Sequence, residues 1–350
     1  MSRLAQDMWK SSSSSHCSGI NNGVADPSSF RREISSFAPK FAGFEQHDSQ
    51  EFLIYALDGI HTELNRIIKK SGKEDQSGLP LKVCATLIAL GWLSHFLISN
   101  QQGEQVTYQD IEEEGISHAE KSQRCLRFYL QKDSSIITDL FLGQFRSTLR
   151  CTHCSHESVT FEPFWVVSVP LSKDTIDLQE CLELFVREET LDGDEMPSCD
   201  DCKDRRKSTK WYSFERWPEI LVIHLKRFAP SGSYRAKLTS NIQVPLSQLD
   251  LRYSLYYISV HSKKLFFNWY CSSFSSDPSV SHSAATYQCY GISNHSGTLH
   301  GGHYIAACRH PYNQDAWHMY NDRSVSGMTS DRVITPEAYL LFFQKVSPSS

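Results

Sequence analysis

The 350-residue chain lacks the marks of several large classes of protein. Its N-terminus, MSRLAQDMWK, has no apolar core followed by a small-residue cleavage site, so we expect no secretory signal. An excess of positive charge is also missing, because a net charge of −5 gives no overall basic face for nucleic acid. The 11 cysteines are odd in number and favour thiols in a reducing compartment, the cytoplasm or the nucleus, over a set of disulfides.

One apolar run, at residues 83–99, carries no Asp, Glu, Lys or Arg. It falls just short of the ~20 residues that a helix needs to cross a bilayer. Its flanks lack the Lys/Arg asymmetry and the aromatic anchors that are typical of membrane spans. We therefore do not expect the membrane to be a partner.

Helices are expected in the first part of the chain. Residues 48–67 place apolar side chains three and four positions apart, which is the pattern of one buried helical stripe. Asp48 is the expected N-cap of this helix, and Glu51 is positioned to complete a capping box. Residues 118–131 predict a second amphipathic helix.

Strands are expected to dominate from Ile136 onward. In residues 218–228, Leu221, Ile223 and Leu225 alternate with the other side chains, which is typical of a strand with one face more buried than the other. Residues 338–345 are expected to form a second, strongly apolar strand. Helices first and strands later indicate the α+β class.

Three segments fit this pattern poorly. The first 25 residues, rich in Ser and Asn, read as a flexible surface segment. Residues 82–114 and 253–285 show neither helical nor strand periodicity. Our hypothesis is that these two are translated non-coding sequence or lineage-specific inserts.

Two C-x-x-C pairs predict a metal site. Four thiolates from two such pairs complete the tetrahedral coordination of one zinc ion, which leaves no open position and indicates a structural site. The long spacer between the pairs must run out and back as strands. His153 and His156 are competing ligands, and four unmetallated core cysteines are the alternative reading. The predicted ligands are Cys151, Cys154, Cys199 and Cys202.

A histidine and an Asn-Asp pair form the candidate catalytic site. His303 stands at the start of a strand over 302–309, behind Gly301 and Gly302, two glycines that allow a peptide backbone to approach closely. The strand 317–320 ends at Asn321-Asp322. Antiparallel pairing of the two strands would place one of these side chains beside His303 and fix the orientation of its imidazole.

These motifs, in this order, resemble the ubiquitin-specific protease family of cysteine deubiquitinases. The resemblance covers most of the chain outside the three poorly patterned segments. The matching stretches are EQHDSQEF (45–52), the two cysteine pairs, LVIHLKRF (221–228), YGISNHSGTLHGGHYIAAC (290–308), WHMYNDRSV (317–325) and AYLLFF (338–343).

The resemblance implies a papain-like fold with thumb, fingers and palm, and a zinc ribbon in the fingers. After a flexible segment over residues 1–30, the expected bounds are about 31–135 for an incomplete thumb, 136–215 for the fingers and 216–350 for the palm. The implied partners are ubiquitin and ubiquitinated proteins, bound by a monomer.

The family's chemistry implies hydrolysis of the isopeptide bond after the C-terminal glycine of ubiquitin. His303 is then the general base, and Asn321 is the orienting residue, with Asp322 as the neighbour that would share or take this role. Asp48 matches a position that contacts the ubiquitin tail, where a carboxylate suits the tail's arginines. Gly301 and Gly302 are the other expected tail contacts.

The sequence departs from the family at the nucleophile. The family's segment GNTCF(M/L)NS, which carries the catalytic cysteine, has no counterpart in these 350 residues. Cys17, Cys84, Cys125 and Cys308 all lack its flanking residues. We therefore expect the chain as written to be inactive. The alternatives are a non-catalytic ubiquitin-binding pseudoenzyme and a zinc-ribbon scaffold unrelated to ubiquitin.

Overall fold

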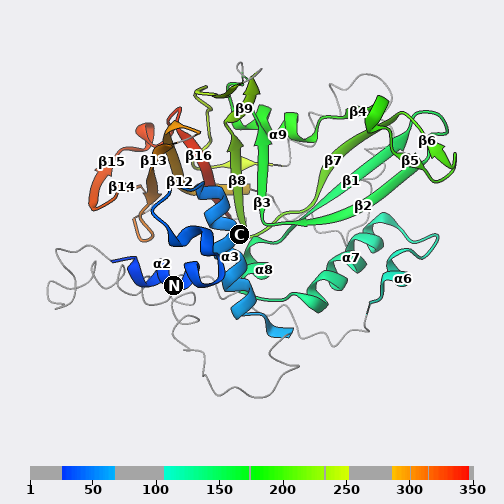
Figure 1. Cartoon of the computed structure of the whole chain (residues 1–350), viewed down its shortest axis with the longest axis horizontal. Helices are drawn as coiled ribbons and strands as arrows, with labels where there is room; N and C mark the ends of the chain where they lie inside the picture. The colour runs from blue at the N-terminus through cyan, green and yellow to red at the C-terminus, as the bar shows by residue number, and fades with distance from the viewer. Residues whose placement is uncertain are drawn as a thin grey trace. The chain divides into compact units, whose positions relative to one another are not determined.

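A computed structural model describes residues 26–67, 106–172, 175–231, 234–251, 286–299, 301–313 and 315–346 (Figure 1). The chain divides into two compact units. Residues up to Glu113 together with Arg127–Ser135 form the first unit, and Glu114–Leu126 together with everything after Ser135 form the second. Residues 1–25, 68–105 and 252–285 hold most of the expected flexible segment and of the two expected inserts, and these lie outside the described residues.

The described residues of the first unit include α2 (Ser28–Phe37), the 3-10 helix η2 (Pro39–Ala42), α3 (Ser49–Glu63) and the single turn α6 (Tyr108–Ile111). A small core joins α2 to α3, with Phe41 packed edge-on against Phe52 at 5.2 Å between ring centroids. The expected N-cap is confirmed, because Asp48 accepts hydrogen bonds from the backbone N–H groups of Gln50 and Glu51. The expected capping box is wrong, since the Glu51 carboxylate pairs with Lys40 at 2.6 Å.

The C-terminal end of α3 carries a buried polar network within the first unit. His61 Nδ1 lies 2.7 Å from Ser135 Oγ, and Asn65 Nδ2 donates to Asp133 Oδ1 at 3.2 Å. The backbone N–H of Arg66 donates to the Ser134 carbonyl at 2.7 Å. These hydrogen bonds attach the end of α3 and the residues after it to residues 133–135.

Helix α7 (His118–Lys132) confirms the second expected helix, and its residues divide between the two units. The second unit also contains the helices α8 (Ile136–Phe141) and α9 (Leu178–Val186). The expectation that strands dominate from Ile136 onward is confirmed by β1 to β16, and α8 and α9 are the helical exceptions among the described residues. Asp177 caps α9 through its contact with the Glu180 N–H, and Leu178 and Cys181 are fully buried on the inner face of that helix.

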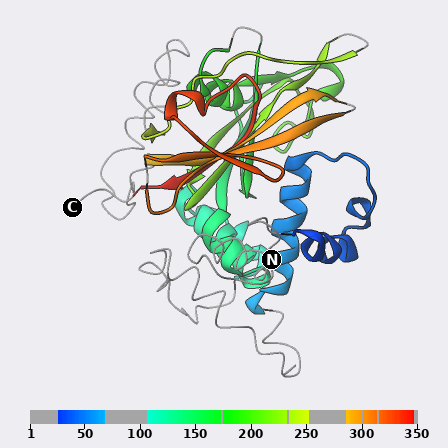
Figure 2. The same ribbon diagram turned by 90° about the vertical axis from the view of Figure 1, so that its left-hand side faces the viewer.

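An eight-stranded sheet carries the main core of the second unit. Its strand order is β15-β14-β13-β12-β16-β8-β3, with β11 paired to β12 as the eighth strand. Neighbours pair antiparallel except β3 and β8, which run parallel. The long antiparallel strands β12 and β13 are the orange pair in Figure 2. The bounds are β3 Val166–Pro170, β8 Ile220–Lys226, β11 Leu249–Asp250, β12 Thr286–Thr298, β13 Gly301–Arg309, β14 Trp317–Asn321, β15 Ser324–Met328 and β16 Ala338–Lys345.

A second sheet carries the first cysteine pair at one end, and the second pair lies in the separate β5–β6 hairpin. The sheet has the order β2-β1-β7-β4, and two short hairpins, β5–β6 and β9–β10, stand apart from it. Stacked aromatic rings fill one of its faces, among them Phe145 against Phe164 at 4.0 Å. The bounds are β1 Gly143–Cys151, β2 Glu157–Phe164, β4 Glu189–Leu191, β5 Ser198–Cys199, β6 Asp204–Arg205, β7 Ser208–Arg216, β9 Phe228–Ser231 and β10 Tyr234–Lys237.

Several expectations meet the structure directly. The strands expected at 218–228 and 338–345 are confirmed as β8 and β16, the two most buried strands of the large sheet. Part of the expected insert 82–114 is helical, because Thr107 forms a capping box with Asp110 at the start of α6. The expected flexible segment 1–30 ends too late, since α2 begins at Ser28. The bounds of thumb, fingers and palm stay predictions.

Among the described helices, none combines the length and the apolar character that crossing a membrane requires. The apolar run at 83–99 lies outside the described residues.

Arg227 fastens the end of β8 to its surroundings. Its side chain is fully buried and donates to three carbonyl oxygens, those of Ala338, Leu238 and Ser240. Burial lowers the pKa of Arg227 to about 10, which leaves the guanidinium charged at neutral pH. The side chain therefore connects the start of β16 with the segment after β10.

Replacing this arginine is expected to destabilise the chain strongly. Arg227→Met leaves three buried carbonyls without their donor and should reduce the free energy of unfolding by about 3 kcal/mol or more. Urea denaturation of Arg227→Met and of the control Lys226→Met, at the exposed neighbouring position, measures this. Equal stability of the two variants would contradict the assigned role.

Candidate functional site

The pairing of β13 with β14 brings His303 and Asn321 together. The two strands run antiparallel, with Ala306 opposite Tyr320, as the sequence predicts. His303 is the third residue of β13, and Asn321 is the last residue of β14. Both side chains therefore lie at the same end of the strand pair.

Asn321 makes the closer contact with the imidazole. His303 Nε2 lies 2.7 Å from Asn321 Oδ1, whereas Asp322 Oδ2 is 3.9 Å away and beyond hydrogen-bond distance. Asp322 follows in a left-handed turn, at φ 49°, and 78 % of its side chain is exposed. Asn321 Oδ1 is thus the nearer of the two acceptors to the imidazole, and the orienting role of either residue stays a prediction.

This hydrogen bond selects one tautomer of His303. An amide oxygen only accepts, so Nε2 must carry the proton that it donates to Asn321. Nδ1 is then the unprotonated nitrogen, with a lone pair available to take a proton. With 47 % of the side chain exposed, the imidazole is open to an incoming group.

Gly302 has a packing role that the sequence analysis did not foresee. A Cβ built on Gly302 would lie 2.3 Å from His295 Nε2 and 2.2 Å from the Ser296 carbonyl oxygen. His295, on the neighbouring strand β12, is buried, and its ring lies tilted against that of Tyr304 at 4.6 Å between centroids. The missing side chain at position 302 therefore makes room for the protein's own His295 beside His303.

The remaining expected tail contacts are Gly301 and Asp48. Gly301 begins β13 and lies opposite Thr298 in the hairpin with β12. Asp48 is the N-cap of α3 and directs Oδ1 to two backbone N–H groups, at 2.7 and 3.3 Å. Asp48 belongs to the first unit and Gly301 to the second.

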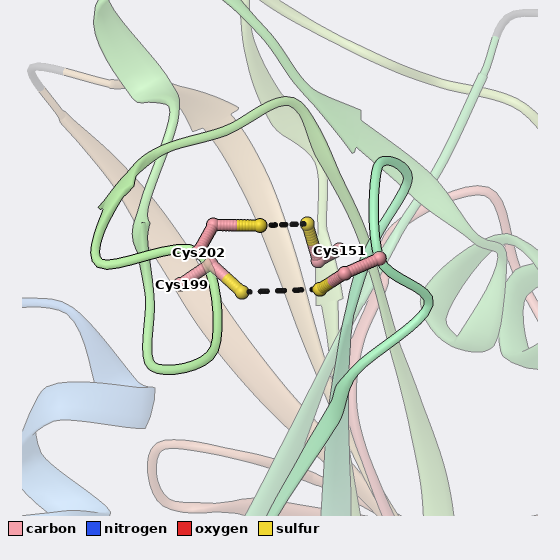
Figure 3. Close-up of side chains that lie close together, drawn as sticks. Cys151, Cys199 and Cys202 are labelled. Atoms are coloured by element: carbon pink, nitrogen blue, oxygen red, sulfur yellow. Dashed lines mark hydrogen bonds between the residues drawn. The ribbon is translucent and has the colours of Figure 1, made fainter.

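The structure brings the four cysteines of the two C-x-x-C pairs together (Figure 3). Their sulfur atoms all lie within 4.8 Å of one another. Cys151 Sγ is 4.0 Å from Cys202 Sγ, and Cys154 Sγ is 3.5 Å from Cys199 Sγ. Four sulfurs around a tetrahedral zinc ion, each about 2.3 Å from the metal, are separated by about 3.8 Å. The cluster fits the group that the sequence predicts.

The two cysteine pairs are built alike. Ser155 and Lys203, each directly after the second cysteine of a pair, adopt left-handed backbone at φ 63° and 55°. Each donates its N–H to the carbonyl of the first cysteine of its pair, at 3.0 and 2.8 Å. The turns aim backbone N–H groups at sulfur: that of Cys154 lowers the pKa of Cys151 to about 7. Such a thiol is prepared to bind metal as a thiolate.

Neither competing histidine joins this cluster. His156 Nδ1 instead lies 3.1 Å from Asp201 Oδ2, which connects the first cysteine pair to the second. His153 Nδ1 is 3.7 Å from the sulfur of Cys202 and contacts the cluster from outside. The spacer between the pairs contains β2, β3 and β4, as expected of strands, but also α9, which is not.

The tautomer of His303 is open to direct measurement. Nitrogen NMR spectra recorded where imidazole is neutral should show His303 protonated at Nε2. Asn321→Ala should give a mixture of tautomers because the acceptor is lost. Asp322→Asn is the matched control and should leave the tautomer unchanged, given its 3.9 Å separation. A mixture in the unsubstituted chain would contradict the geometry.

Comparisons with known proteins identify the family of this chain. The family model described as "Ubiquitin carboxyl-terminal hydrolase" matches residues 1–343. Ubiquitin carboxyl-terminal hydrolase 2 of Bos taurus is 38% identical over 353 residues, covering 99% of this chain and 47% of the relative. The protein of the same name from Gallus gallus is 36% identical over 351 residues and covers 99% and 80%.

The solved structures agree on the fold. The SAGA Ubp8/Sgf11/Sus1/Sgf73 DUB module bound to ubiquitin aldehyde matches with a TM-score of 0.58 at 22% identity, covering 94% of this chain and 56% of that chain. The ubiquitin-specific protease fold expected from the motifs is thus confirmed. The chain spans about half the length of the mammalian relative quoted above. On the match of the family model and the identity to these relatives, the chain belongs to the ubiquitin carboxyl-terminal hydrolase family.

Proposed function

We propose that this chain is the ubiquitin-recognising and base-bearing part of a cysteine deubiquitinase. The observation that carries the proposal is the 2.7 Å contact between His303 Nε2 and Asn321 Oδ1, which leaves Nδ1 as the basic nitrogen. The family membership and the ubiquitin-bound state of the matching solved structure support the same reading. The proposed substrate is a protein joined through lysine to the C-terminal glycine of ubiquitin.

In the proposed reaction His303 handles the protons. Nδ1 takes the proton of a cysteine thiol, and the thiolate forms a bond to the carbonyl carbon of ubiquitin's terminal glycine. As the C–N bond breaks, the imidazolium donates its proton to the departing lysine amine, and water then hydrolyses the thioester and restores the thiol. Asn321 keeps the ring oriented throughout, because its amide oxygen accepts from Nε2 in both protonation states. Asp322, whose exposed carboxylate lies 3.9 Å from Nε2, is the neighbour that would share the orienting role.

Other residues are proposed to bind ubiquitin or to hold the fold that binds it. Asp48 forms charge-assisted contacts with arginines of the ubiquitin tail, in addition to capping α3. The backbone at Gly301 and Gly302 lines the path of the tail. We also propose that the protein acts as a monomer in the cytoplasm or the nucleus.

We propose zinc as the ion of the four-cysteine cluster, since the sulfur separations of 3.5 and 4.0 Å suit a tetrahedral zinc site. Four protein ligands complete its coordination, so the ion would be structural. When bound, it would join the β1–β2 turn to the β5–β6 turn, two segments that are far apart in the sequence.

Removing the metal should loosen this end of the four-stranded sheet. The purified chain should contain about one zinc ion per molecule by mass spectrometry, and chelation should lower the melting temperature by about 5 °C or more. Cys202→Ser should lose the zinc, whereas Cys125→Ser, outside the cluster, should keep it. A chain with no bound metal, and with the same melting temperature after chelation, would refute the site.

The nucleophile is the open part of the proposal. The GNTCF(M/L)NS segment is missing from these 350 residues, so we propose that they bind ubiquitin but do not cleave by themselves. The same absence favours a second candidate function, that of a ubiquitin-binding pseudoenzyme.

A ubiquitin with an electrophilic C-terminal warhead tests both points. The full chain should bind unmodified ubiquitin by calorimetry and should form no covalent adduct with ubiquitin vinyl sulfone. His303→Ala should bind ubiquitin equally well, since it changes the base and not the recognition surface. Absence of binding would overturn the proposed recognition. An adduct would overturn the proposed lack of a nucleophile, and Cys17→Ser and Cys308→Ser variants would then locate the thiol.

A further inference from the structure

The eight-stranded sheet ends in a strand with an open edge. β15 is the outermost strand of the sheet order, and Figure 1 shows it at the rim, next to β14. Four of its five residues, Ser324 to Gly327, are exposed. Its sequence, SVSGM, contains no lysine or proline, the residues that commonly protect an edge from pairing with another chain.

The hairpin geometry shows which backbone groups face outward. Asn321 pairs with Ser324 across a two-residue turn, so these two residues exchange both of their hydrogen bonds. Because bonded and non-bonded pairs alternate, Ser326 and Met328 also bond back to β14. The N–H and C=O groups of Val325 and Gly327 therefore point away from the sheet.

The side chains along this edge leave room for another strand. Val325 is 57% exposed, and no atom of the described chain lies within 4 Å of a Cβ built on Gly327. Two outward residues at alternate positions form the template on which an extended peptide adds a strand.

This edge is continuous with the candidate site. Asn321, which contacts His303, and Ser324, which begins β15, form the same backbone pair. An added strand would lie about 4.8 Å from β15. Residues on one side of the ubiquitin-bearing lysine would pair with β15, and the lysine itself would lie beyond Ser324, at the end of the strands that carry Asn321 and His303.

We propose that β15 binds the target protein: an extended segment of the target, on one side of the ubiquitin-bearing lysine, adds to β15 as a further strand through Val325 and Gly327. This inference rests on the proposed function and extends it from the ubiquitin side of the isopeptide bond to the lysine side. The target would be recognised through backbone hydrogen bonds. Such bonds select for an extended segment and depend little on its amino-acid sequence.

Binding of an intact conjugate tests the inference. The probe is ubiquitin joined through its C-terminal glycine to the lysine of TVTVKTVTV, a peptide of about nine residues with high strand propensity. Affinity is measured by calorimetry on the full chain for this conjugate and for ubiquitin alone. Val325→Pro removes one outward N–H, and proline is tolerated at such an edge position. Val325→Thr, which keeps the N–H and the branched side chain, is the matched control.

For the unsubstituted chain and for Val325→Thr, the affinity for the conjugate should be roughly tenfold higher than the affinity for ubiquitin alone. This gain is what about two added hydrogen bonds would give. Val325→Pro should lose this gain and keep its affinity for ubiquitin alone. That unchanged affinity also shows that the variant is folded.

Three results would overturn the inference. Val325→Pro that keeps the full gain would exclude pairing at β15. A dimer of the unsubstituted chain that Val325→Pro converts to monomer, measured by sedimentation, would assign the edge to a second copy of the chain. If neither ubiquitin nor the conjugate binds the unsubstituted chain, the proposed function itself fails, and this inference fails with it.

Discussion

The register of β13 against β14 is the constraint on which the candidate site depends. Ala306 faces Tyr320, and this alignment brings Asn321 within 2.7 Å of His303 Nε2. A slip of one residue in an antiparallel pair turns every side chain to the other face of the sheet, so the alignment must be held firmly. Neighbouring packing supplies that support: His295 fills the space beside Gly302, and Arg227 fastens the start of β16, which pairs with β12. A polar contact at an exposed sheet end is thereby fixed by buried groups behind it.

The sulfur atoms of the four-cysteine cluster are positioned mainly by local turn geometry. Each cysteine pair lies in a turn that presents two sulfur atoms. The residue after the second cysteine, Ser155 or Lys203, has left-handed backbone and donates its N–H to the carbonyl of the first cysteine. Only the approach of the two turns depends on the wider fold, through the pairing of β1 with β7 and the contact of His156 with Asp201. A bound metal ion would hold the two turns together. It would thereby stabilise the end of the four-stranded sheet where β1 and β2 meet.

Sequence alone predicts the features that depend on local pattern. The cap at Asp48, the strands around 221–226 and 338–345, and the cysteine pairs all follow from the spacing of residue types. It fails where long-range packing decides. α9 is a different case, because its signals are present in the sequence and were overlooked: Leu178, Cys181 and Leu182 follow helical spacing, and Asp177 with Glu180 three residues later marks a helix start. Gly302 shows the limit that packing sets: a glycine beside a candidate base suggests an open path, but only the register reveals that His295 fills the space. The difference between Asn321 and Asp322 also required coordinates, because only they show Asn321 Oδ1 at 2.7 Å and Asp322 Oδ2 at 3.9 Å from His303 Nε2.

The central claim is that these residues present an oriented base to the C-terminus of ubiquitin. A crystal structure of the chain in complex with ubiquitin tests it most directly. The account predicts the terminal glycine of ubiquitin beside His303, with the carboxylate within about 4 Å of Nδ1 and the contact between Nε2 and Asn321 intact. A complex in which ubiquitin's tail lies elsewhere, or in which His303 turns away from Asn321, would contradict it.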